Sequence, residues 1–389
     1  MRKKGKRKMM RPMKLAGSEL MFGYGSLEYI KSIKAKKAAI VLGGSSMEKN
    51  GILGKVKKYL AEAGIQNLEI NGVESDPSFA TVMRGAKSML EFEPDLIIAL
   101  GGGSVMDAAK AMWIFYEHPE LKSMEDILPP NAFPDLRNKA RLCCVPSTSG
   151  TASEVSRSIV ISGDDGIKLG VGNMEMMPDI AICDPEVTLS MPPKITAETG
   201  MDAMTHALEA LVSTRANYLS DVLATQAVLD IAEALPQAYQ NGEDRSAREK
   251  MLLASMLAGM AFTNVSLGIV HSMAHTVGGL FHVAHGLADA ILLPYIIRYN
   301  RKDQRAAEIY QQIARKAGVN DIVELVTELN GKLGIPDCLS AVIPDQAAYH
   351  EKMDQMIEMA KNDGCTKTNP IIPSAQEWRE LFTKAYKGE

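Results

Sequence analysis

The apolar pattern of the chain changes near Pro192-Pro193, and this change limits the possible folds more than any other feature of the sequence. Before it, short β-branched runs such as residues 96–100 end in glycines and alternate with amphipathic stretches. This alternation is typical of a parallel sheet covered by helices. After it, apolar residues recur at the helical period and strand patterns are almost absent. The sequence therefore predicts an α/β domain with a parallel sheet over residues 15–193 and an all-α domain over residues 194–389.

The same patterns give the expected elements. Strands are expected at residues 38–42, 67–70, 96–100, 141–145 and 158–162. Helices of the first domain are expected at residues 51–63, 78–91 and 105–117. Helices of the second domain are expected at residues 200–213, 217–234, 247–262, 267–281, 304–317, 320–332, 346–362 and 375–386.

Composition excludes several classes of protein. No apolar stretch reaches the roughly 20 residues needed to cross a bilayer, so no membrane partner is expected. The formal net charge of −4 argues against a nucleic-acid partner. Residues 1–14 carry eight basic groups with no apolar run after them, which predicts a disordered basic tail and no secretory signal. The five scattered cysteines favour a reducing, cytoplasmic location.

Four of the seven histidines lie close together at His271, His275, His282 and His285, among small and apolar residues. Imidazole is both a good metal ligand and a proton carrier near neutral pH, so the cluster favours a dry metal or proton-transfer site. A buried helix whose histidines are only hydrogen-bonded would give the same pattern.

An acidic residue and a further histidine extend this set. Asp202 and His206 are four residues apart in a helical pattern, which places carboxylate and imidazole on one face. Nitrogen and oxygen ligands without thiolate suit Zn²⁺ or Fe²⁺ better than Mg²⁺ or Ca²⁺. Spacing favours His275 as the partner of His271, because His271 and His285 would stand roughly 21 Å apart on an unbroken helix. The glycines between them allow a break that returns His285, so both ligand sets stay open.

Two loops follow predicted strands in positions suited to a nucleotide. In Gly101-Gly102-Gly103-Ser104 the missing Cβ atoms would let backbone N–H groups approach a pyrophosphate at a helix N-terminus. Ser104 and Asp107 also fit a capping box that only starts the helix. The second loop, residues 146–154, fits phosphate or ribose binding and helix capping about equally.

Taken together, these segments resemble the iron-containing, or group III, alcohol dehydrogenases. The resemblance runs from about residue 20 to the end of the sequence. It rests on six motifs: Gly101–Lys110, Pro146–Glu154, Pro178–Pro185, Gly200–His206, Gly268–Pro294 and Asn369-Pro370. It implies a Rossmann-like domain and a helical domain in a dehydroquinate synthase-like architecture, assembled as a homodimer or larger homo-oligomer.

The resemblance also implies roles for individual residues. One divalent metal, with Fe²⁺ favoured and Zn²⁺ or Ni²⁺ also suited, would be held by Asp202, His206, His271 and His285. His285 thus replaces His275, which becomes a catalytic proton relay beside the substrate. The expected dinucleotide contacts are Gly43, Gly44, Ser46, Gly101, Gly102, Gly103, Ser104, Asp107, Thr148, Ser149, Thr151 and Lys168.

One departure from the family pattern concerns the choice of cofactor. Many NAD-using members carry an aspartate after the first strand, where this chain has Gly43-Gly44-Ser45-Ser46 followed by Lys49. Without that carboxylate the 2′-phosphate of NADP is not repelled, and the serine hydroxyls and Lys49 can bind it. We therefore expect NADP in preference to NAD.

These observations predict a metal-dependent oxidoreductase that interconverts a small primary alcohol and its aldehyde with NAD(P)(H). Two other functions compete with it. One is a metal-dependent hydrolase of a phosphorylated small molecule that uses the same interdomain cleft, and the other is a non-catalytic nucleotide-binding scaffold. The nucleotide loops argue against the first, and the complete set of metal ligands argues against the second.

Overall fold

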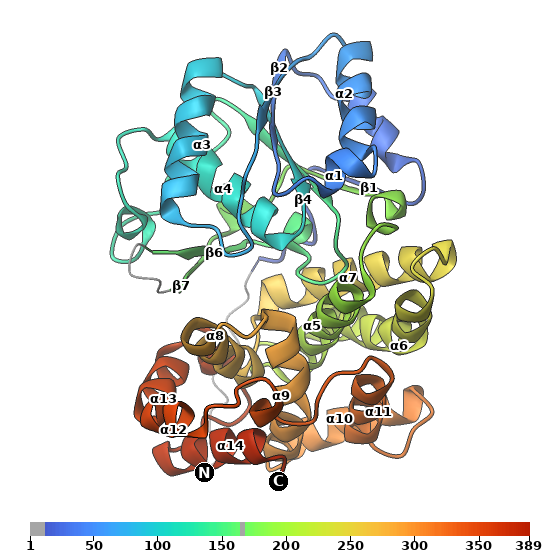
Figure 1. Cartoon of the computed structure of the whole chain (residues 1–389), viewed down its shortest axis with the longest axis vertical. Coiled ribbons are helices and arrows are strands. Elements are labelled where there is room, and N and C mark those ends of the chain that lie inside the picture. Colours follow the sequence, from blue (N-terminus) through green and yellow to red (C-terminus); the bar gives the residue numbers. More distant parts are fainter. Residues whose placement is uncertain (1–11, 164–167) are drawn as a thin grey trace, which may run out of the picture.

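The computed structural model describes residues 12–163 and 168–389, which form two stacked halves (Figure 1). We call residues 19–183 the sheet half and residues 193–387 the helical half. The predicted basic tail, residues 1–14, falls almost entirely outside the described residues. Within the described ranges no single helix is both long and apolar enough to cross a membrane, and only one pair of helices, joined at a 101° bend, meets that test together.

A six-stranded parallel sheet forms the centre of the sheet half, in the order β1-β8-β5-β4-β2-β3. Its strands are β1 Glu19–Phe22, β2 Lys37–Val41, β3 Gln66–Ile70, β4 Leu96–Gly101, β5 Arg141–Pro146 and β8 Ile180–Cys183. The strands β6 Ser158–Ser162 and β7 Lys168–Gly172 pair antiparallel in a separate two-stranded sheet.

Helices cover both faces of the parallel sheet (Figure 1). They are α1 Ser46–Lys49, α2 Ile52–Glu62, α3 Phe79–Phe92 and α4 Gly103–Glu117. Side chains of β4 alternate between two cores, as the period of a strand requires. Leu96 and Ile98 belong to the core under α2, whereas Ile97 and Ala99 belong to the core under α3 and α4. Burial on both faces explains why this strand is a continuous apolar run.

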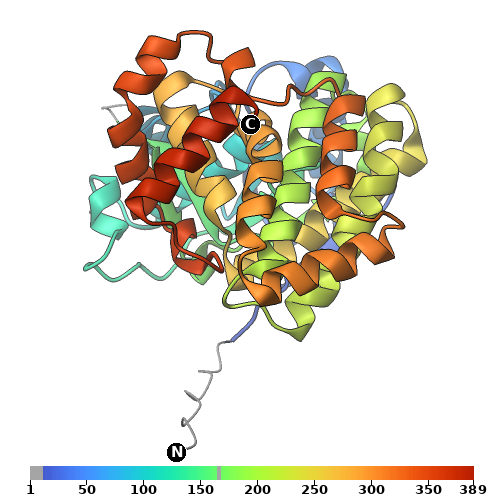
Figure 2. The same ribbon diagram turned by 90° about the horizontal axis from the view of Figure 1, so that it is seen from below.

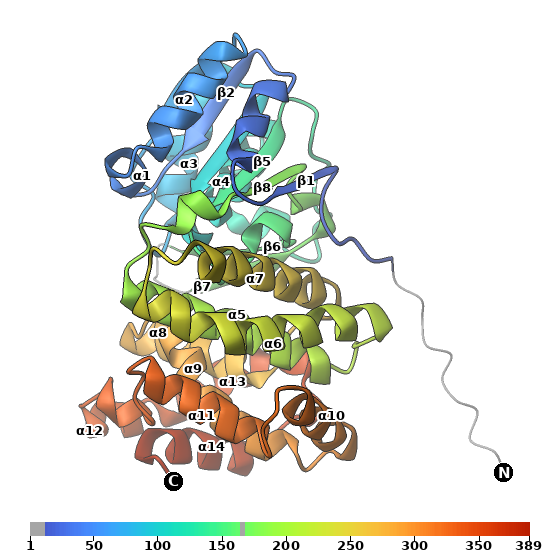
Figure 3. The same cartoon turned by 90° about the vertical axis from the view of Figure 1, so that its right-hand side faces the viewer.

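Ten helices of the described chain build the helical half, seen from below in Figure 2. They are α5 Pro193–Val212, α6 Tyr218–Gln240, α7 Arg245–Val265, α8 Ile269–Phe281, α9 His285–Asn300, α10 Gln304–Lys316, α11 Ile322–Lys332, α12 Gln346–Glu351, α13 Met353–Asn362 and α14 Ala375–Lys387. A single apolar core joins them. In Figure 3, α5 and α7 lie directly beneath the sheet half.

The predicted fold class is confirmed: a parallel sheet with covering helices is followed by a helical part. The positions of several elements differ from the prediction. The structure adds β1, β7, β8, α1 and α9, starts α5 at Pro193, and divides the helix expected at residues 346–362 into α12 and α13.

Candidate metal centre and cofactor loops

Three helices bring the predicted metal ligands together. Asp202 and His206 lie one turn apart on α5, His271 lies in the first turn of α8, and His285 is the first residue of α9. The chain turns back after Phe281, because the next residue adopts a left-handed conformation that ends α8. This turn, and not a break at the glycines inside α8, returns His285 to the other three residues.

The ligand atoms of these residues face one another. Oδ1 of Asp202 lies 3.4 Å from Nε2 of His206, 3.6 Å from Nε2 of His271 and 3.9 Å from Nε2 of His285. Ligands that share one tetrahedral ion at roughly 2.1 Å are about 3.4 Å apart, so the separations fit a common cation. Oδ1 of Asp202 and Nε2 of His271 are buried and have no hydrogen-bond partner in the described part of the chain.

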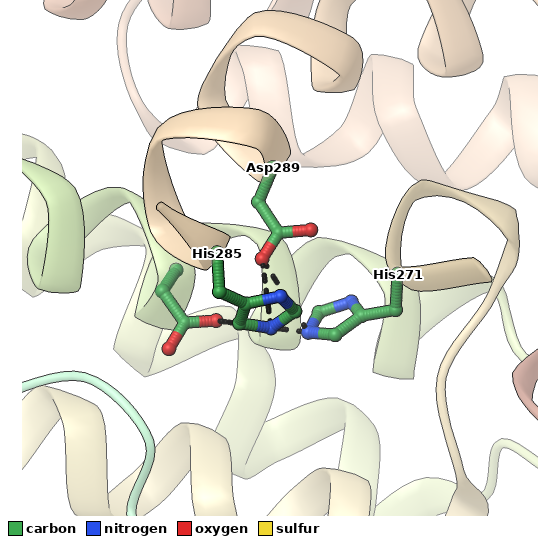
Figure 4. Close-up of side chains that lie close together, drawn as sticks. His271, His285 and Asp289 are labelled. Carbon is green, nitrogen blue, oxygen red and sulfur yellow. Dashed lines mark ion pairs between the residues drawn. The ribbon is translucent and has the colours of Figure 1, made fainter. Parts of the chain in front are cut away.

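A second carboxylate, which the sequence analysis did not identify, joins this cluster. Oδ2 of Asp289 lies 3.2 Å from Nε2 of His285 and 3.8 Å from Nε2 of His271 (Figure 4). Asp202, His271, His285 and Asp289 each offer a ligand atom within 4.8 Å of the others, whereas His206 is not in this group and approaches it at Oδ1 of Asp202. Asp289 follows His285 by four residues, the same spacing as between Asp202 and His206 but with the histidine first. This signal was missed because no helix was predicted there.

Glu209 holds the ring of His271 in place. Its Oε2 lies 2.7 Å from Nδ1 of His271 and accepts a hydrogen bond from the backbone N–H of Gly268 at 2.9 Å. Its Oε1 accepts a hydrogen bond from the backbone N–H of Val270 at 2.7 Å. The carboxylate thus caps the N-terminus of α8 and leaves Nε2 of His271 directed at Asp202.

The charges in the cluster are set by burial and by neighbouring groups. Burial lowers the pKa of His206 to about 4 and that of His285 well below its usual range. Burial alone would raise the pKa of Asp202, but the neighbouring imidazoles of His206, His271 and His285 hold it below the usual range. Neutral imidazole and ionised carboxylate are the forms that bind metals, so these three side chains are in the binding form at neutral pH.

His275 lies next to the cluster of predicted metal ligands but is not part of it. Its ring stacks on that of His285 at a centroid distance of 5.2 Å, and its Nδ1 lies 2.8 Å from Oδ2 of Asp363. Asp363 is fixed in turn by the backbone N–H of Cys365 at 2.7 Å. The carboxylate therefore orients a partly exposed imidazole next to a predicted ligand. The fourth histidine of the sequence cluster, His282, is exposed and caps α8.

The two predicted cofactor loops lie against each other. A Cβ atom on Gly102 would come within 3.3 Å of the Thr148 side chain, and one on Gly103 within 2.5 Å of the Thr151 side chain. Larger residues at these positions would push the loops apart. The backbone N–H of Ser147 also donates to the carbonyl of Gly101 at 2.9 Å, which ties the end of β4 to the second loop.

The second loop also packs on α5. A Cβ atom on Gly150 would lie 2.6 Å from Cβ of Thr199, one turn before Asp202. The neighbouring Ser149 is buried, and its hydroxyl has no hydrogen-bond partner in the described ranges. The loop predicted to hold a dinucleotide thus directly adjoins the helix that carries two predicted metal ligands.

Two of the predicted cofactor contacts have partners inside the protein. Oδ1 of Asp107 accepts a hydrogen bond from the Ser153 hydroxyl at 2.7 Å, and its Oδ2 accepts one from the backbone N–H of Val160 at 2.9 Å. The hydroxyl of Ser104 donates to the carbonyl of Ser75. In this structure both side chains fix the second loop, β6 and the residues before α3.

The remaining predicted contacts lie elsewhere around the sheet. Gly43 and Gly44 follow β2, and the exposed Ser46 begins α1. A Cβ atom on Gly43 would lie 3.2 Å from Val105, whereas one on Gly44 would meet no atom within 4 Å. The predicted contact Lys168 begins β7, and its side chain falls outside the described part of the structure.

Comparison with known proteins gives consistent matches. The profile "Iron-containing alcohol dehydrogenase" matches residues 17–185, and "Fe-containing alcohol dehydrogenase family, C-terminal" matches residues 196–386. The NADPH-dependent butanol dehydrogenase of Clostridium saccharobutylicum is 47% identical over 95% of this chain and 97% of its own. The alcohol dehydrogenase of Thermococcus barophilus is 37% identical over 95% and 98% of the two chains.

Solved structures agree with the sequence matches. The iron-containing alcohol dehydrogenase of Thermococcus thioreducens superposes with a TM-score of 0.90 at 34% identity, over 97% of this chain and all of its own. None of these matches supports a hydrolase of phosphorylated molecules. The profiles, the relatives and the fold together show that the chain belongs to the iron-containing alcohol dehydrogenase family and is a metal-dependent oxidoreductase that interconverts alcohols and aldehydes with a nicotinamide cofactor.

Proposed function

We propose that this enzyme reduces a short-chain aldehyde with NADPH, and oxidises the corresponding primary alcohol in reverse, at a metal held by Asp202, His206, His271 and His285. This ligand set is supported by the positions of three imidazole nitrogens around Oδ1 of Asp202. Nε2 of His206, His271 and His285 lie 3.4, 3.6 and 3.9 Å from it. Fe²⁺ is favoured by the family, and the same set of donors accepts Zn²⁺ or Ni²⁺.

The side chains around this centre have separable tasks. A bound divalent cation supplies a Lewis acid for the substrate oxygen. His275 donates its Nδ1–H to Asp363 in this scheme, so that Nε2 is left to accept the alcohol proton or to return it. The glycines at the end of β4 and the hydroxyls of residues 147–151 hold the dinucleotide beside α5, where its nicotinamide can exchange hydride with the substrate.

A preference for NADP is supported by the loop after β2. Gly44, Ser46 and Lys49 are exposed, and no carboxylate occupies residues 43–46. The hydroxyl and ammonium groups offer hydrogen bonds to a 2′-phosphate. The name of the relative from Clostridium saccharobutylicum, an NADPH-dependent butanol dehydrogenase, supports both this cofactor and a short-chain substrate.

Assembly and location are proposed from the family resemblance and from the cysteines. A homo-oligomer and a cytoplasmic location fit an enzyme of this family. All five cysteines are free thiols, and Cys143, Cys144 and Cys183 are buried, as expected in a reducing compartment. The proposed domain boundary stays at residues 193 and 194, where α5 begins.

The test follows the oxidation of the reduced nicotinamide by its absorbance. Metal-loaded protein is mixed with each of a series of short-chain aldehydes, with NADPH or NADH in parallel samples. NADPH oxidation should exceed NADH oxidation and should stop when a chelator removes the metal. His271→Ala should lose metal and turnover together, while the matched control His350→Ala, an exposed histidine on α12, should keep both. Turnover that survives chelation, or metal retained by His271→Ala, would contradict the proposal.

A further inference from the structure

We propose that Asp289 is an additional protein ligand of the metal, so that two carboxylates and three imidazoles surround the cation. The inference rests on the metal centre proposed above. It adds a residue outside the ligand set that the family resemblance implies, and it bears on which ions the centre prefers.

The position of Asp289 gives the first argument. Its side chain is completely buried on α9, and neither carboxylate oxygen has a hydrogen-bond partner in the described ranges. Oδ2 approaches Nε2 of His285 at 3.2 Å and Nε2 of His271 at 3.8 Å. These two nitrogens also face Oδ1 of Asp202, at 3.9 and 3.6 Å. Figure 4 shows the Asp289 carboxylate directed at the two imidazoles.

The identity of the facing atoms gives the second argument. A carboxylate that only orients a histidine contacts the nitrogen opposite the metal, as Glu209 does at Nδ1 of His271. Asp289 instead faces Nε2, the nitrogen that points into the cluster. A ring nitrogen that binds a metal has no hydrogen to donate, so His285 cannot satisfy Asp289 while it serves as a ligand.

Unused hydrogen-bonding capacity gives the third argument. The oxygens of Glu209 accept hydrogen bonds from the backbone N–H groups of Gly268 and Val270, at 2.9 and 2.7 Å. Asp289 is as deeply buried as Glu209 but has no such donors. Its carboxylate also lies within 4.8 Å of that of Asp202. Two buried carboxylates this close repel each other when both are ionised, and a cation between them offsets that repulsion.

An added carboxylate should change the ion preference of the centre. Two carboxylates and three neutral imidazoles balance the charge of a divalent ion, and they exceed the four ligands of a tetrahedral zinc site. Carboxylate suits Mn²⁺, whereas imidazole suits Zn²⁺. The wild-type centre should therefore bind Mn²⁺ better, relative to Zn²⁺, than the same centre without Asp289.

The test compares wild type with Asp289→Asn, which keeps the shape and removes the charge, in the full-length protein. Chelator competition should show Mn²⁺ affinity falling at least about tenfold more than Zn²⁺ affinity. The visible bands of the Co²⁺-loaded protein should intensify, because Co²⁺ absorbs more strongly with fewer ligands.

Glu209→Gln is the matched control, because Glu209 is equally buried but contacts the far nitrogen of His271. It should weaken Mn²⁺ and Zn²⁺ binding to similar extents and leave the intensity of the Co²⁺ bands unchanged. Asp289→Ser, smaller and neutral, repeats the test if the asparagine variant does not fold. Unchanged bands and an unchanged ratio of Mn²⁺ to Zn²⁺ affinity in a folded variant would overturn the role of Asp289 alone. Absence of Co²⁺ binding by wild type would overturn the metal centre and this inference with it.

Discussion

Several of the buried polar atoms that lack a protein partner in the described ranges lie at the metal centre and in the cofactor loops, while others, such as the Tyr299 hydroxyl and Nε1 of Trp378, lie elsewhere. Oδ1 of Asp202, Nε2 of His271 and both oxygens of Asp289 belong to the first group, and so does the hydroxyl of Ser149. The buried carboxylate of Glu209, by contrast, is fully used within the protein. A buried polar group is stable only with a partner. Within the histidine and aspartate cluster, the unpartnered atoms therefore agree with the proposed metal site, while the satisfied carboxylate of Glu209 holds that site in shape.

Sequence spacing alone was not sufficient to decide whether His275 or His285 joins His271 as a metal ligand. It favoured His275, because an unbroken helix would carry His285 far from His271. The structure places His285 beside Asp202 because the chain reverses after α8. The spacing rule failed since it cannot say where a helix ends. Asp289 was missed for the same reason.

Cofactor choice can be tested at Gly44, where a Cβ atom would meet nothing within 4 Å and the backbone accepts any residue. Gly44→Asp should lower the ratio of kcat/KM with NADPH to that with NADH by roughly 10- to 100-fold, or about 1.4–2.8 kcal/mol, because the carboxylate repels a 2′-phosphate. Gly44→Asn, equal in size and neutral, is the control and should change the ratio little. Equal effects of the two substitutions would refute the electrostatic argument.

A pH-dependent contribution to stability is expected from Glu154 in the second loop. Burial raises the pKa of Glu154 from an ordinary 4.5 to about 7. The folded protein thus keeps this proton up to a higher pH than the unfolded chain does. The stability gained in this way is fully present below 4.5 and is lost as the pH rises through 7.

Glu154→Gln should remove that dependence. Relative to the variant, wild type should lose up to about 3 kcal/mol of unfolding free energy between about pH 5 and about pH 9. Urea unfolding of both proteins at the two pH values measures the difference. A wild type that gains stability over the variant as the pH rises would show that Glu154 is ionised in the folded protein.

At the scale of elements, α9 is a helix that the sequence pattern did not predict. A glycine follows its first residue and Pro294 lies inside it, and both features normally argue against a helix. Proline has no N–H for the carbonyl of Ala290, four residues earlier. The side chain of Asn330, from α11, donates to that carbonyl at 2.8 Å instead. The helix depends on a tertiary contact, which no local pattern reports.

Short strands were missed for a related reason. β1 and β8 have four residues each, and each is defined by its pairing, with the register Glu19 to Ile180 through Phe22 to Cys183. The longer apolar runs of β2, β4 and β5 were predicted correctly because burial on both faces imposes a pattern on the sequence itself. Burial alone does not separate the predicted strands from the missed ones, because all four residues of β8 are buried, whereas β3, which was predicted, is only partly buried.

The packing of α9 on α5 can be tested at Gly286. A Cβ atom there would lie 2.2 Å from the carbonyl oxygen of Glu198, so Gly286→Ala must separate the two helices. We expect a loss of about 1–3 kcal/mol of stability and weaker metal binding, because His285 moves away from Asp202. Urea unfolding and chelator competition measure the two effects.

Gly279→Ala in α8 is the control, since its Cβ atom would make only an ordinary contact with Met359 at 3.8 Å. Gly279→Ala should raise the free energy of unfolding by roughly 0.5–1 kcal/mol, because alanine stabilises a helix interior relative to glycine. It should leave metal binding unchanged. If Gly286→Ala behaves like this control, the close contact between α9 and α5 does not position His285.

At the scale of the whole molecule, the two halves contribute different parts of the proposed site. The proposed metal ligands all come from α5, α8 and α9, while the glycine and hydroxyl loops come from the sheet half. The contact of Gly150 with Thr199 joins the second loop to α5. The change of pattern at residue 193 predicted these two parts from the sequence, but their contact depends on side-chain packing that periodicity does not encode.

Metal removal should therefore affect the halves unequally. A ligand that binds only the folded protein stabilises it by about 4 kcal/mol at a thousandfold excess over its Kd, and the protection is greatest where the ligand joins elements. Hydrogen exchange with and without metal should show slower exchange in α5, α8 and α9 of the loaded protein, and little change in β2 and β3. His271→Ala should show no difference between the two conditions. Equal protection of both halves would mean that the cation stabilises the whole fold and does not act by joining three helices.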